Sequence, residues 1–254
     1  MGLFSIFSHH HEPVELFYDT DVHCHILPGV DHGAADMATA MDLLRREFDM
    51  GIRHVICTSH VTEGTFENTR ESLTAAYDAL CAEVKRQQLP IELHVSAEYR
   101  LDDYFIKQYH ADVLLPMPGN WLLVENSFQQ ELLNLDELLF ELQIKGYNIV
   151  MAHPERYAYY GIRRERYEQL HNAGVKFQIN LLSLAGYFGG NARDNALWLI
   201  KNNMVEMLGS DMHFAGHAEE ISKYLASREW RKLSERLEPH IINDRLTTYW
   251  SSPN

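Results

Sequence analysis

The sequence predicts an α/β fold, a single closed barrel of seven β/α units. Short β-rich runs alternate with longer helical patterns along the 254 residues, which implies a parallel sheet with helices outside it. Gly51, Gly146 and Gly174 each fall between a helical pattern and a β-rich run, where a left-handed cap residue belongs. An open doubly wound sheet is the alternative, but no glycine-rich nucleotide-binding motif follows any predicted strand.

Hydrophobic periodicity and the turn residues between segments indicate the order of the strands and helices. We expect β-strands, beginning with the run FYDTDV, at 17–22, 52–57, 91–97, 121–125, 147–152, 176–180 and 205–209. Helical patterns lie near 36–50, 68–88, 131–145, 162–173, 191–202 and 217–236, and a shorter helix is expected at 102–112. No linker or low-complexity segment divides the series, so residues 17–254 are predicted to form one domain.

Residues 1–16 are predicted to form a mobile tail. The segment MGLFSIF is apolar but too short to span a bilayer, and it lacks the Ser or Thr that myristoylation requires at the sixth position. Membrane contact is therefore expected to be indirect at most. A weak contact of the tail with a membrane surface or with another subunit is the alternative.

Charge and cysteine usage narrow the possible partners and the compartment. A formal net charge of −14 argues against a nucleic-acid-binding surface and against binding to an anionic membrane. Cys24, Cys57 and Cys81 are odd in number and lack disulfide-like spacing. With no secretory signal in the sequence, a reducing cytoplasm is the expected location.

Potential metal ligands stand at the ends of six of the seven predicted strands. The first strand leads into His23-Cys24-His25, and strand alternation places the two histidines on one side and the cysteine on the other. The candidates at the other strand ends are His60, Glu98, Glu125, His153, Asp211 and His213. Because the carboxyl ends of barrel strands build the active site, these side chains should meet at one rim and bind metal.

The composition of this ligand set indicates which metals and what chemistry to expect. Imidazole and carboxylate without thiolate favour Mn, Fe or Zn in a catalytic rather than a structural site. The candidates exceed what one ion needs, so two or three divalent ions are predicted, and Glu98 is able to bridge two of them. Clustered ions stabilise the attacking and leaving oxygens of a phosphoryl displacement and lower the pKa of bound water.

Two arginines follow the predicted ligands closely. Arg156 stands three residues after His153 in the motif HPER, and its planar fork matches phosphate oxygens. A surface salt bridge with Glu155 is the alternative for Arg156. Arg100, just beyond Glu98, is a second candidate for binding substrate. A thiolate phosphatase is excluded because no cysteine has an arginine six residues later.

Several segments resemble motifs of the bacterial manganese-dependent protein-tyrosine phosphatases of the PHP (polymerase and histidinol phosphatase) superfamily, which occur with capsule and exopolysaccharide systems. The segments are DVHCHILPGVDHGAAD, CTSH, SAEYR, HPERY and GSDMH, and they cover about residues 18–215 in the right order. The resemblance implies a distorted seven-unit barrel holding three manganese ions. It also implies hydrolysis of phosphotyrosine by a metal-bound hydroxide, on a substrate such as a tyrosine kinase of capsule synthesis.

The same resemblance distributes the candidate ligands over three ions. The implied sets are His23, His25, Glu98 and Asp211 for the first ion, Glu98, Glu125 and His153 for the second, and Asp31, His60 and His213 for the third. Arg156 matches the family arginine that binds phosphate. The family commonly has an acidic pair where this chain has Asp31-His32, so the choice between these two residues as ligand stays open.

The leaving-group side of the site departs from the family pattern. Some members carry a second arginine after the DxH motif, whereas this chain reads FAGHAEE, with His217 nearest. A protonated His217 is predicted to contact the phosphate or the leaving group; a surface residue at a helix start is the alternative. Aromatic residues that follow the strands are expected to pack a substrate phenyl ring or the loops themselves: Tyr99, Tyr157, Tyr159, Tyr160, Tyr187, Phe188 and Phe214.

Other functions share parts of this pattern. Histidinol-phosphate phosphatase, or another small-molecule phosphoesterase, is the main alternative to a protein-tyrosine phosphatase, and a nuclease is disfavoured by the acidic charge. A metal-dependent amidohydrolase commonly needs a lysine at a strand end, and these strand ends have none. A binding module without turnover is the remaining alternative. The sequence leaves open whether the chain forms a homo-oligomer.

Overall fold

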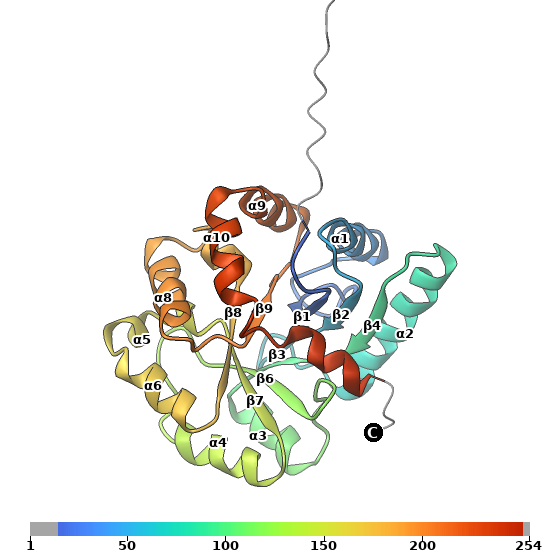
Figure 1. The fold of residues 1–254 in the computed structure, drawn as a ribbon. Coiled ribbons are helices and arrows are strands. Elements are labelled where there is room, and N and C mark those ends of the chain that lie inside the picture. Colours follow the sequence, from blue (N-terminus) through green and yellow to red (C-terminus); the bar gives the residue numbers. More distant parts are fainter. Residues whose placement is uncertain (1–14, 251–254) are drawn as a thin grey trace, which may run out of the picture.

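The structure is a computed structural model that describes residues 15–250, so the predicted tail lies almost wholly outside the described residues (Figure 1). The strands are β1 (Thr20–Cys24), β2 (His54–Cys57), β3 (His60–Val61), β4 (Glu92–Val95), β5 (Glu98–Arg100), β6 (Trp121–Glu125), β7 (Asn148–Ala152), β8 (Lys176–Asn180) and β9 (Met207–Gly209). The helices are α1 (Met37–Asp49), α2 (Arg70–Arg86), α3 (Asp103–His110), α4 (Leu135–Ile144), α5 (Ala158–Ile162), α6 (Glu165–Asn172), α7 (Leu181–Leu184), α8 (Gly190–Lys201), α9 (Ala215–Leu225) and α10 (Arg228–Leu237). Two 3-10 helices complete the described chain, η1 (Pro154–Arg156) and η2 (Asn243–Tyr249).

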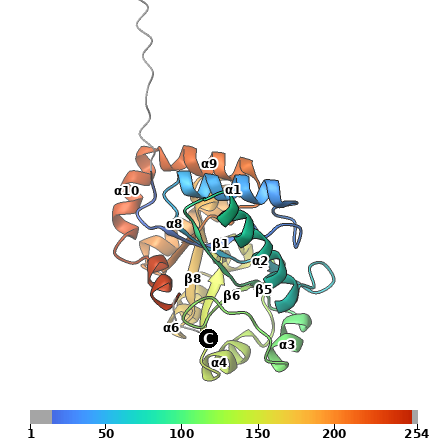
Figure 2. The same cartoon turned by 90° about the vertical axis from the view of Figure 1, so that its right-hand side faces the viewer.

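The strands pair in parallel and form two sheets that curl together into a half-barrel, which confirms the predicted α/β class. One sheet has the order β1-β2-β4 and the other the order β3-β5-β6-β7-β8-β9. A parallel bridge between Cys24 and Met212 joins β1 to the segment after β9, where the backbone N–H of Asp211 also donates to the carbonyl of His23 at 2.8 Å. Figures 1 and 2 show helices packed around the outside of these strands.

Two predicted strands are each followed by a short second strand that was not predicted. The run at 52–57 contains β2, and after two unpaired residues the chain pairs again as β3; the run at 91–97 contains β4, and β5 follows it in the same way. Each break moves the pairing from one sheet to the other, since β2 pairs with β4 and β3 pairs with β5. The breaks bring His60 and Glu98 to the start of short strands directly opposite one another.

Helix boundaries follow local capping chemistry. Gly51, Gly146 and Gly174 have φ values of 96°, 93° and 91°, which confirms the predicted left-handed positions after α1, α4 and α6. The predicted helix at 217–236 is instead two helices, because Ser227 adopts an extended conformation and its side chain caps α10 by accepting from the N–H of Trp230. The short helix α7 was not predicted.

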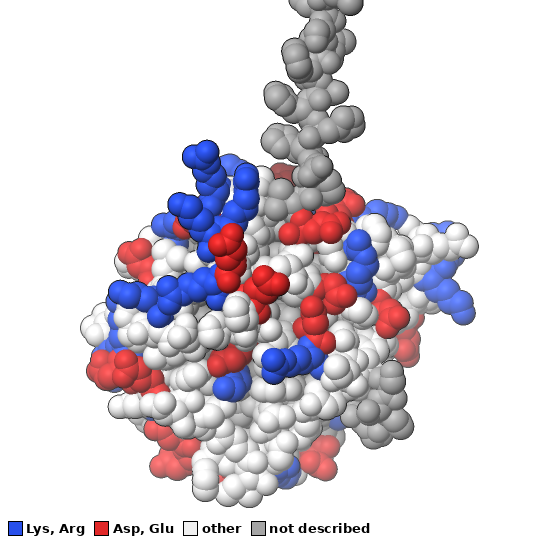
Figure 3. All heavy atoms as spheres, viewed as in Figure 1, with Lys and Arg blue, Asp and Glu red and all other residues white. Residues whose placement is uncertain are grey.

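Both signs of charge occur on the face drawn in Figure 3, where Lys and Arg gather mainly at the upper left, around α10, and Asp and Glu are scattered over the rest. Among residues 15–250, no helix is both long enough and apolar enough to cross a membrane. The strands themselves are mostly buried, as expected for parallel strands covered on the outside by helices.

Candidate metal centre

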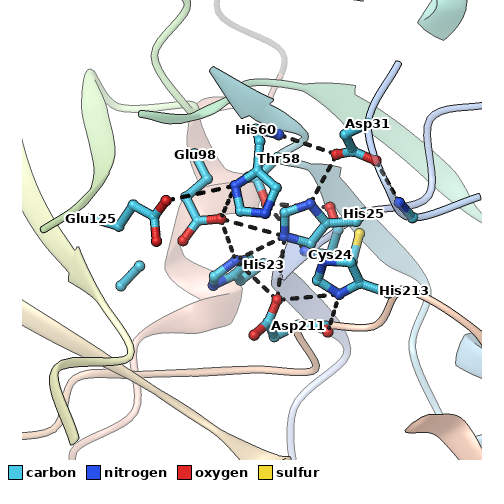
Figure 4. Close-up of polar contacts among 12 residues, drawn as sticks. His23, Cys24, His25, Asp31, Thr58, His60, Glu98, Glu125, Asp211 and His213 are labelled. Carbon is cyan, nitrogen blue, oxygen red and sulfur yellow. Dashed lines mark hydrogen bonds and ion pairs between the residues drawn. The ribbon is translucent and has the colours of Figure 1, made fainter. Parts of the chain in front are cut away.

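The predicted ligands from different strands point toward one another at the carboxyl ends of the strands (Figure 4). His23 lies in β1, and His25 follows it; their Nε2 atoms are 3.3 Å apart. Cys24 is buried on the other side, with its thiol 3.6 Å from the carbonyl oxygen of Ile56. The strand alternation predicted for this motif is therefore present, and it aims both imidazoles at the same region.

Glu98 lies at the middle of the cluster. Its Oε2 atom is 2.9 Å from Nδ1 of His60 and 3.4 Å from Nε2 of both His23 and His25. Its other oxygen, Oε1, is 2.8 Å from Nε2 of His153. A single buried carboxylate thus contacts four imidazoles from three different segments, which is the arrangement expected of a carboxylate that bridges metal ions.

Asp211 occupies the corresponding position on the β9 side. Its Oδ1 atom is 3.2 Å from Nε2 of His25 and 3.5 Å from Nε2 of His23. Asp211 and His153 have φ values of 49° and 35°, in the left-handed region that non-glycine residues rarely adopt. Such backbone strain concentrates at functional sites, where the surrounding structure holds the residue in place.

The ligand atoms form four overlapping groups in which all atoms lie within 4.8 Å of one another. The groups are His25, His60 and His213; His23, Glu98 and His153; His23, His25 and Asp211; and His60, Glu98 and Glu125. Several of their buried atoms, Nε2 of His213 among them, have no hydrogen-bond partner within the described residues. Because buried polar atoms are normally satisfied, these donors and acceptors fit divalent metal ions.

Burial and charge set the ionisation of this cluster. Burial opposes ionisation of Glu98 and Asp211, but the charge on His23 and other imidazoles outweighs it and holds the pKa of both carboxyls well below the usual range. Burial, with Glu98 acting in the same direction, raises the pKa of Glu125 to about 7. Burial lowers the pKa of His153 to about 4. Despite its burial, the pKa of His23 is raised to about 9 by the charges of Glu98 and Asp211. Glu98, Asp211 and His153 are therefore in the forms that bind metal, and a metal ion would displace the proton of His23.

Asp31 and His32, between which the sequence left the ligand open, take different positions. Both oxygens of Asp31 are occupied: Oδ2 is 2.9 Å from Nδ1 of His25 and 3.1 Å from the backbone nitrogen of His60, and Oδ1 accepts from the N–H of Gly33. Asp31 belongs to none of the four groups. The imidazole of His32 stacks on that of His213 with ring centroids 4.5 Å apart. The contacts of Asp31 are those of a residue that orients His25.

Gly33 makes this arrangement possible. A Cβ atom at this position would lie 2.1 Å from the carbonyl oxygen of His25, closer than any side chain allows. The loop can therefore fold back against His25 only with glycine here, and its backbone N–H then holds Asp31.

Gln178 and Asn180 are site residues that the sequence analysis missed. Gln178 Oε1 lies 2.7 Å from Nδ1 of His23, and Asn180 donates to Asp211 at 2.6 Å. A hydrogen bond at one ring nitrogen of a histidine fixes the other toward a metal. The sequence did contain an indication of both residues. β8 is the strand without a predicted ligand, and Gln178 and Asn180 are two positions apart along it, so both point to the same face.

A pocket of about 290 Å³ opens over the cluster. It is lined by His32, His60, Arg100, Glu125, Phe128, His153, Arg156, Phe188, Asp211, His213, Phe214 and His217. Both predicted arginines and His217 therefore face the same space as the potential metal ligands.

Arg156 is held by one carboxylate and two aromatic rings. Its Nη1 donates to Oδ2 of Asp211 at 3.0 Å, and its guanidinium lies 3.9 Å from the ring centroid of Phe188 and 4.7 Å from that of Phe128. The salt bridge with Glu155, considered as an alternative, is not the one observed. Glu155 is buried and accepts from the hydroxyl of Ser183 at 2.6 Å.

Arg100, which also lines the pocket, has a similar environment. It donates to Oε1 of Glu125 at 2.8 Å, and its guanidinium lies 5.8 Å from the ring of Phe128. Phe128 thus touches both arginines of the pocket and stacks on His153. The sequence analysis did not include Phe128, because it lies beyond β6 in a segment without a recognisable motif.

His217 lies near the start of α9 and is buried, so the surface alternative for it is wrong. Its Nδ1 accepts from the backbone N–H of His213 at 3.3 Å, which leaves the ring proton on Nε2. Burial lowers its pKa. The structure therefore favours a neutral His217 that donates through Nε2, and not the protonated ring that was predicted.

Five of the seven predicted aromatic residues separate into two kinds. Tyr99, Tyr157 and Tyr160 are buried, and the Tyr157 hydroxyl donates to the carbonyl of Ala152 at 3.0 Å. These residues pack the loops. Phe188 and Phe214, in contrast, line the pocket.

Fold and site together indicate a metal-dependent hydrolase of the α/β class. The chain belongs to the capsular polysaccharide synthesis CpsB/CapC family, whose model matches residues 19–239. It is 31% identical over 194 residues to the tyrosine-protein phosphatase YwqE of Bacillus subtilis, covering 76% of each chain. It is 25% identical over 199 residues to the tyrosine-protein phosphatase CpsB of Streptococcus pneumoniae, covering 76% of this chain and 82% of CpsB.

Solved structures agree with this assignment. The chain matches a structure from the pair YwqE of Bacillus subtilis and CpsB of Streptococcus pneumoniae, described as unique metal-dependent tyrosine phosphatases, with a TM-score of 0.77 and 29% identity. This match covers 87% of this chain and 91% of the other. A histidinol phosphate phosphatase from Lactococcus lactis shares the fold, with a TM-score of 0.56 and 14% identity over 88% of this chain and 95% of its own. The predicted family resemblance is confirmed.

Proposed function

We propose that the chain hydrolyses phosphotyrosine in proteins and is a metal-dependent protein-tyrosine phosphatase. The observation that carries the proposal is the set of overlapping imidazole and carboxylate groups beneath a pocket that also holds Arg156. The relatives named as tyrosine-protein phosphatases support the choice of substrate. The likeness to a histidinol phosphate phosphatase is one of fold alone.

Two or three divalent ions are proposed to occupy the four overlapping groups, with manganese as the metal. Glu98 belongs to two groups, and its two carboxylate oxygens would hold neighbouring ions together. When bound, such ions neutralise phosphate charge and lower the pKa of a water that attacks phosphorus. Asp31 is proposed to orient His25, and His32 to face the pocket beside His213.

Arg156 is proposed to bind the phosphate. Its guanidinium lines the pocket, and the rings of Phe128 and Phe188 hold it above Asp211, so it is oriented before substrate arrives. A planar fork held in place offers two parallel hydrogen bonds to phosphate oxygens. Arg100 is proposed to add a second positive charge near Glu125.

His217 is proposed to donate a hydrogen bond from Nε2 to the leaving oxygen. The contact between its Nδ1 and the N–H of His213 fixes this tautomer. A phenolate needs little more help, because phenol has a pKa of about 10 and leaves more easily than an alkoxide. The site therefore suits an aryl phosphate better than an alkyl phosphate.

Three further features are proposed from the same observations. First, β2 and β3 act as one bent strand, and so do β4 and β5, so β1 to β9 fill seven positions. These positions form a distorted barrel that the bridge between Cys24 and Met212 closes. Residues 17–254 form one domain. The protein substrate is a tyrosine kinase of capsule or exopolysaccharide synthesis.

Steady-state kinetics on matched substrates tests the function. The full chain in a manganese buffer should have a higher kcat/KM on a phosphotyrosine peptide than on the same peptide with phosphoserine or on histidinol phosphate. Asp211→Asn serves as the inactive control, because it removes a charge that faces His23 and His25. A higher kcat/KM on histidinol phosphate would replace the proposed substrate with the alternative.

A further inference from the structure

Phe214 differs from the other aromatic residues of the pocket. It follows His213 directly and precedes α9, and 48% of its side-chain surface remains exposed although it lines the pocket. Its ring lies on the imidazole of His217, with centroids 3.9 Å apart. The ring therefore offers exposed apolar surface at the wall of the pocket, next to the potential metal ligand His213.

Local sequence keeps the ring in this position. A Cβ atom at position 216 would lie 3.2 Å from the Phe214 ring, so Gly216 leaves the space that the ring occupies. The backbone is also fixed, because the Nδ1 of His217 accepts from the N–H of His213. The ring therefore has a defined place relative to the potential metal ligands Asp211 and His213.

The other aromatic side chains at the pocket have different contacts. Phe128 and Phe188 both face the guanidinium of Arg156, and Phe128 also stacks on His153. Tyr157 is buried beneath them. In the described part of the chain, no arginine or lysine lies over the ring of Phe214. Its free face is available to a substrate.

We propose that Phe214 determines specificity by packing against the phenyl ring of the substrate. The inference rests on the proposed function, because it needs an aryl phosphate whose phosphate lies between Arg156 and the metal ligands. A ring attached to that phosphate has to leave through the pocket that Phe214 lines. Phosphoserine places no ring there, so the contact favours phosphotyrosine alone. Aromatic pairs of this kind change affinity by about 2- to 12-fold beyond area burial.

Kinetics of Phe214→Ala, Phe214→Leu and Phe214→Trp test this inference. Phe214→Ala should raise KM for a phosphotyrosine peptide by about 3- to 10-fold with little change in kcat, because the contact is made equally before and during reaction. Phe214→Leu should have a KM between those of the wild type and Phe214→Ala, and Phe214→Trp should have a KM near that of the wild type. Inhibition by inorganic phosphate, which has no ring, should be the same in all variants.

The controls separate this inference from structural effects and from the proposed function. Phe140→Ala removes a ring on α4 that is 62% exposed and lies outside the pocket, and it should leave KM unchanged. Unchanged KM in Phe214→Ala would overturn the inference, as would an equal weakening of phosphate inhibition, which would assign Phe214 to holding His213 and His217. A wild-type chain without turnover of phosphotyrosine peptides would overturn the proposed function and the inference with it.

Discussion

The floor of the pocket and its mouth are built in opposite ways. The floor consists of buried side chains such as His23 in β1 and Glu98 at the start of β5, whose positions follow from parallel pairing and from hydrogen bonds to buried polar partners. The mouth consists of Arg156, Phe128 and Phe214, which come from the segments after β7, β6 and β9 and are partly exposed. The rigid sheet therefore sets the chemistry, while the loops select the substrate.

The difference has an energetic reason. Metal ligands must stand within a narrow range of positions, and strands fix side chains more firmly than loops do. Burying a carboxylate or an imidazole also costs free energy unless it faces an opposite charge or an ion. Glu98 and His60 face one another, with Oε2 of Glu98 2.9 Å from Nδ1 of His60. The mouth carries a smaller cost, because its arginines retain contact with water and with aromatic rings.

The largest effect is expected when the floor is broken at its centre. Glu98→Gln keeps the size of the side chain but removes the charge that four imidazoles share, so divalent ions should be lost and kcat/KM should fall by more than about 10³-fold. Metal content by mass spectrometry and turnover of a phosphotyrosine peptide measure both effects. Exposed Glu141→Gln is the matched control. Full metal content together with full activity would show that Glu98 is structural.

A change at the mouth should separate activity from metal binding. Arg156→Ala removes the charge held above Asp211 and should lower kcat/KM about 10²- to 10³-fold, as the loss of one preorganised charge-stabilising donor does elsewhere. Its metal content should stay near that of the wild type, because Arg156 is not a ligand. Arg156→Lys keeps the charge and loses the fork, so partial activity is expected. Loss of the fold in Arg156→Ala would assign this residue to structure instead.

A change behind the floor should weaken metal binding without abolishing it. Gln178→Ala removes the hydrogen bond that orients His23, and losses of this kind cost about 10- to 100-fold in metal affinity or activity. Calorimetric titration of the metal-free chain with Mn²⁺ measures the affinity directly. An unchanged dissociation constant would mean that packing alone orients His23.

The smallest effect on activity, but a clear one on stability, is expected from Glu155→Gln. Burial raises the pKa of Glu155 to about 7 despite the hydrogen bonds that Ser183 and Asn180 donate. The pKa of Glu155 is higher in the folded chain than in the unfolded chain, where it is about 4.3, so protonation of this group stabilises the fold. This contribution to the free energy of unfolding is complete below about pH 4.3 and is lost as the pH rises through about 7. The free energy of unfolding should therefore fall by on the order of 3 kcal/mol between about pH 5 and pH 8 because of this group.

Glu155→Gln should remove that part of the pH dependence, since the amide stays neutral. Urea unfolding of the wild type and of the variant at both pH values gives the difference, in which other titrating groups cancel. A wild-type and a variant curve that run in parallel would mean that Glu155 is ionised in the folded chain at neutral pH.

Sequence alone predicted the floor better than the mouth. His23 and His25 point to the same side because side chains alternate along a strand, and this was predicted. The gathering of ligands at one rim was also predicted, because it follows from the parallel topology. The break that separates β2 from β3 was not predicted, because it depends on a switch of partners between two sheets. The orienting contact of Asp31 was also missed, since it depends on a loop that only Gly33 allows to approach His25.

The mouth was harder to predict for a physical reason. Loop side chains such as Phe128 are placed by contacts with residues far away in sequence, here Arg100 and Arg156, and no local periodicity records such contacts. His217 was identified, but its tautomer depends on one backbone hydrogen bond that only the structure shows.

Removal of the metal is the most direct test of whether hydrolysis depends on ions bound at this site. The full chain is treated with a chelator until its metal content is a trace, and turnover of a phosphotyrosine peptide is measured before and after Mn²⁺ is added back. If the buried groups around His23, Glu98 and Asp211 hold the ions that drive hydrolysis, activity should fall to background and return with Mn²⁺. Unchanged turnover in the metal-free chain would contradict the account.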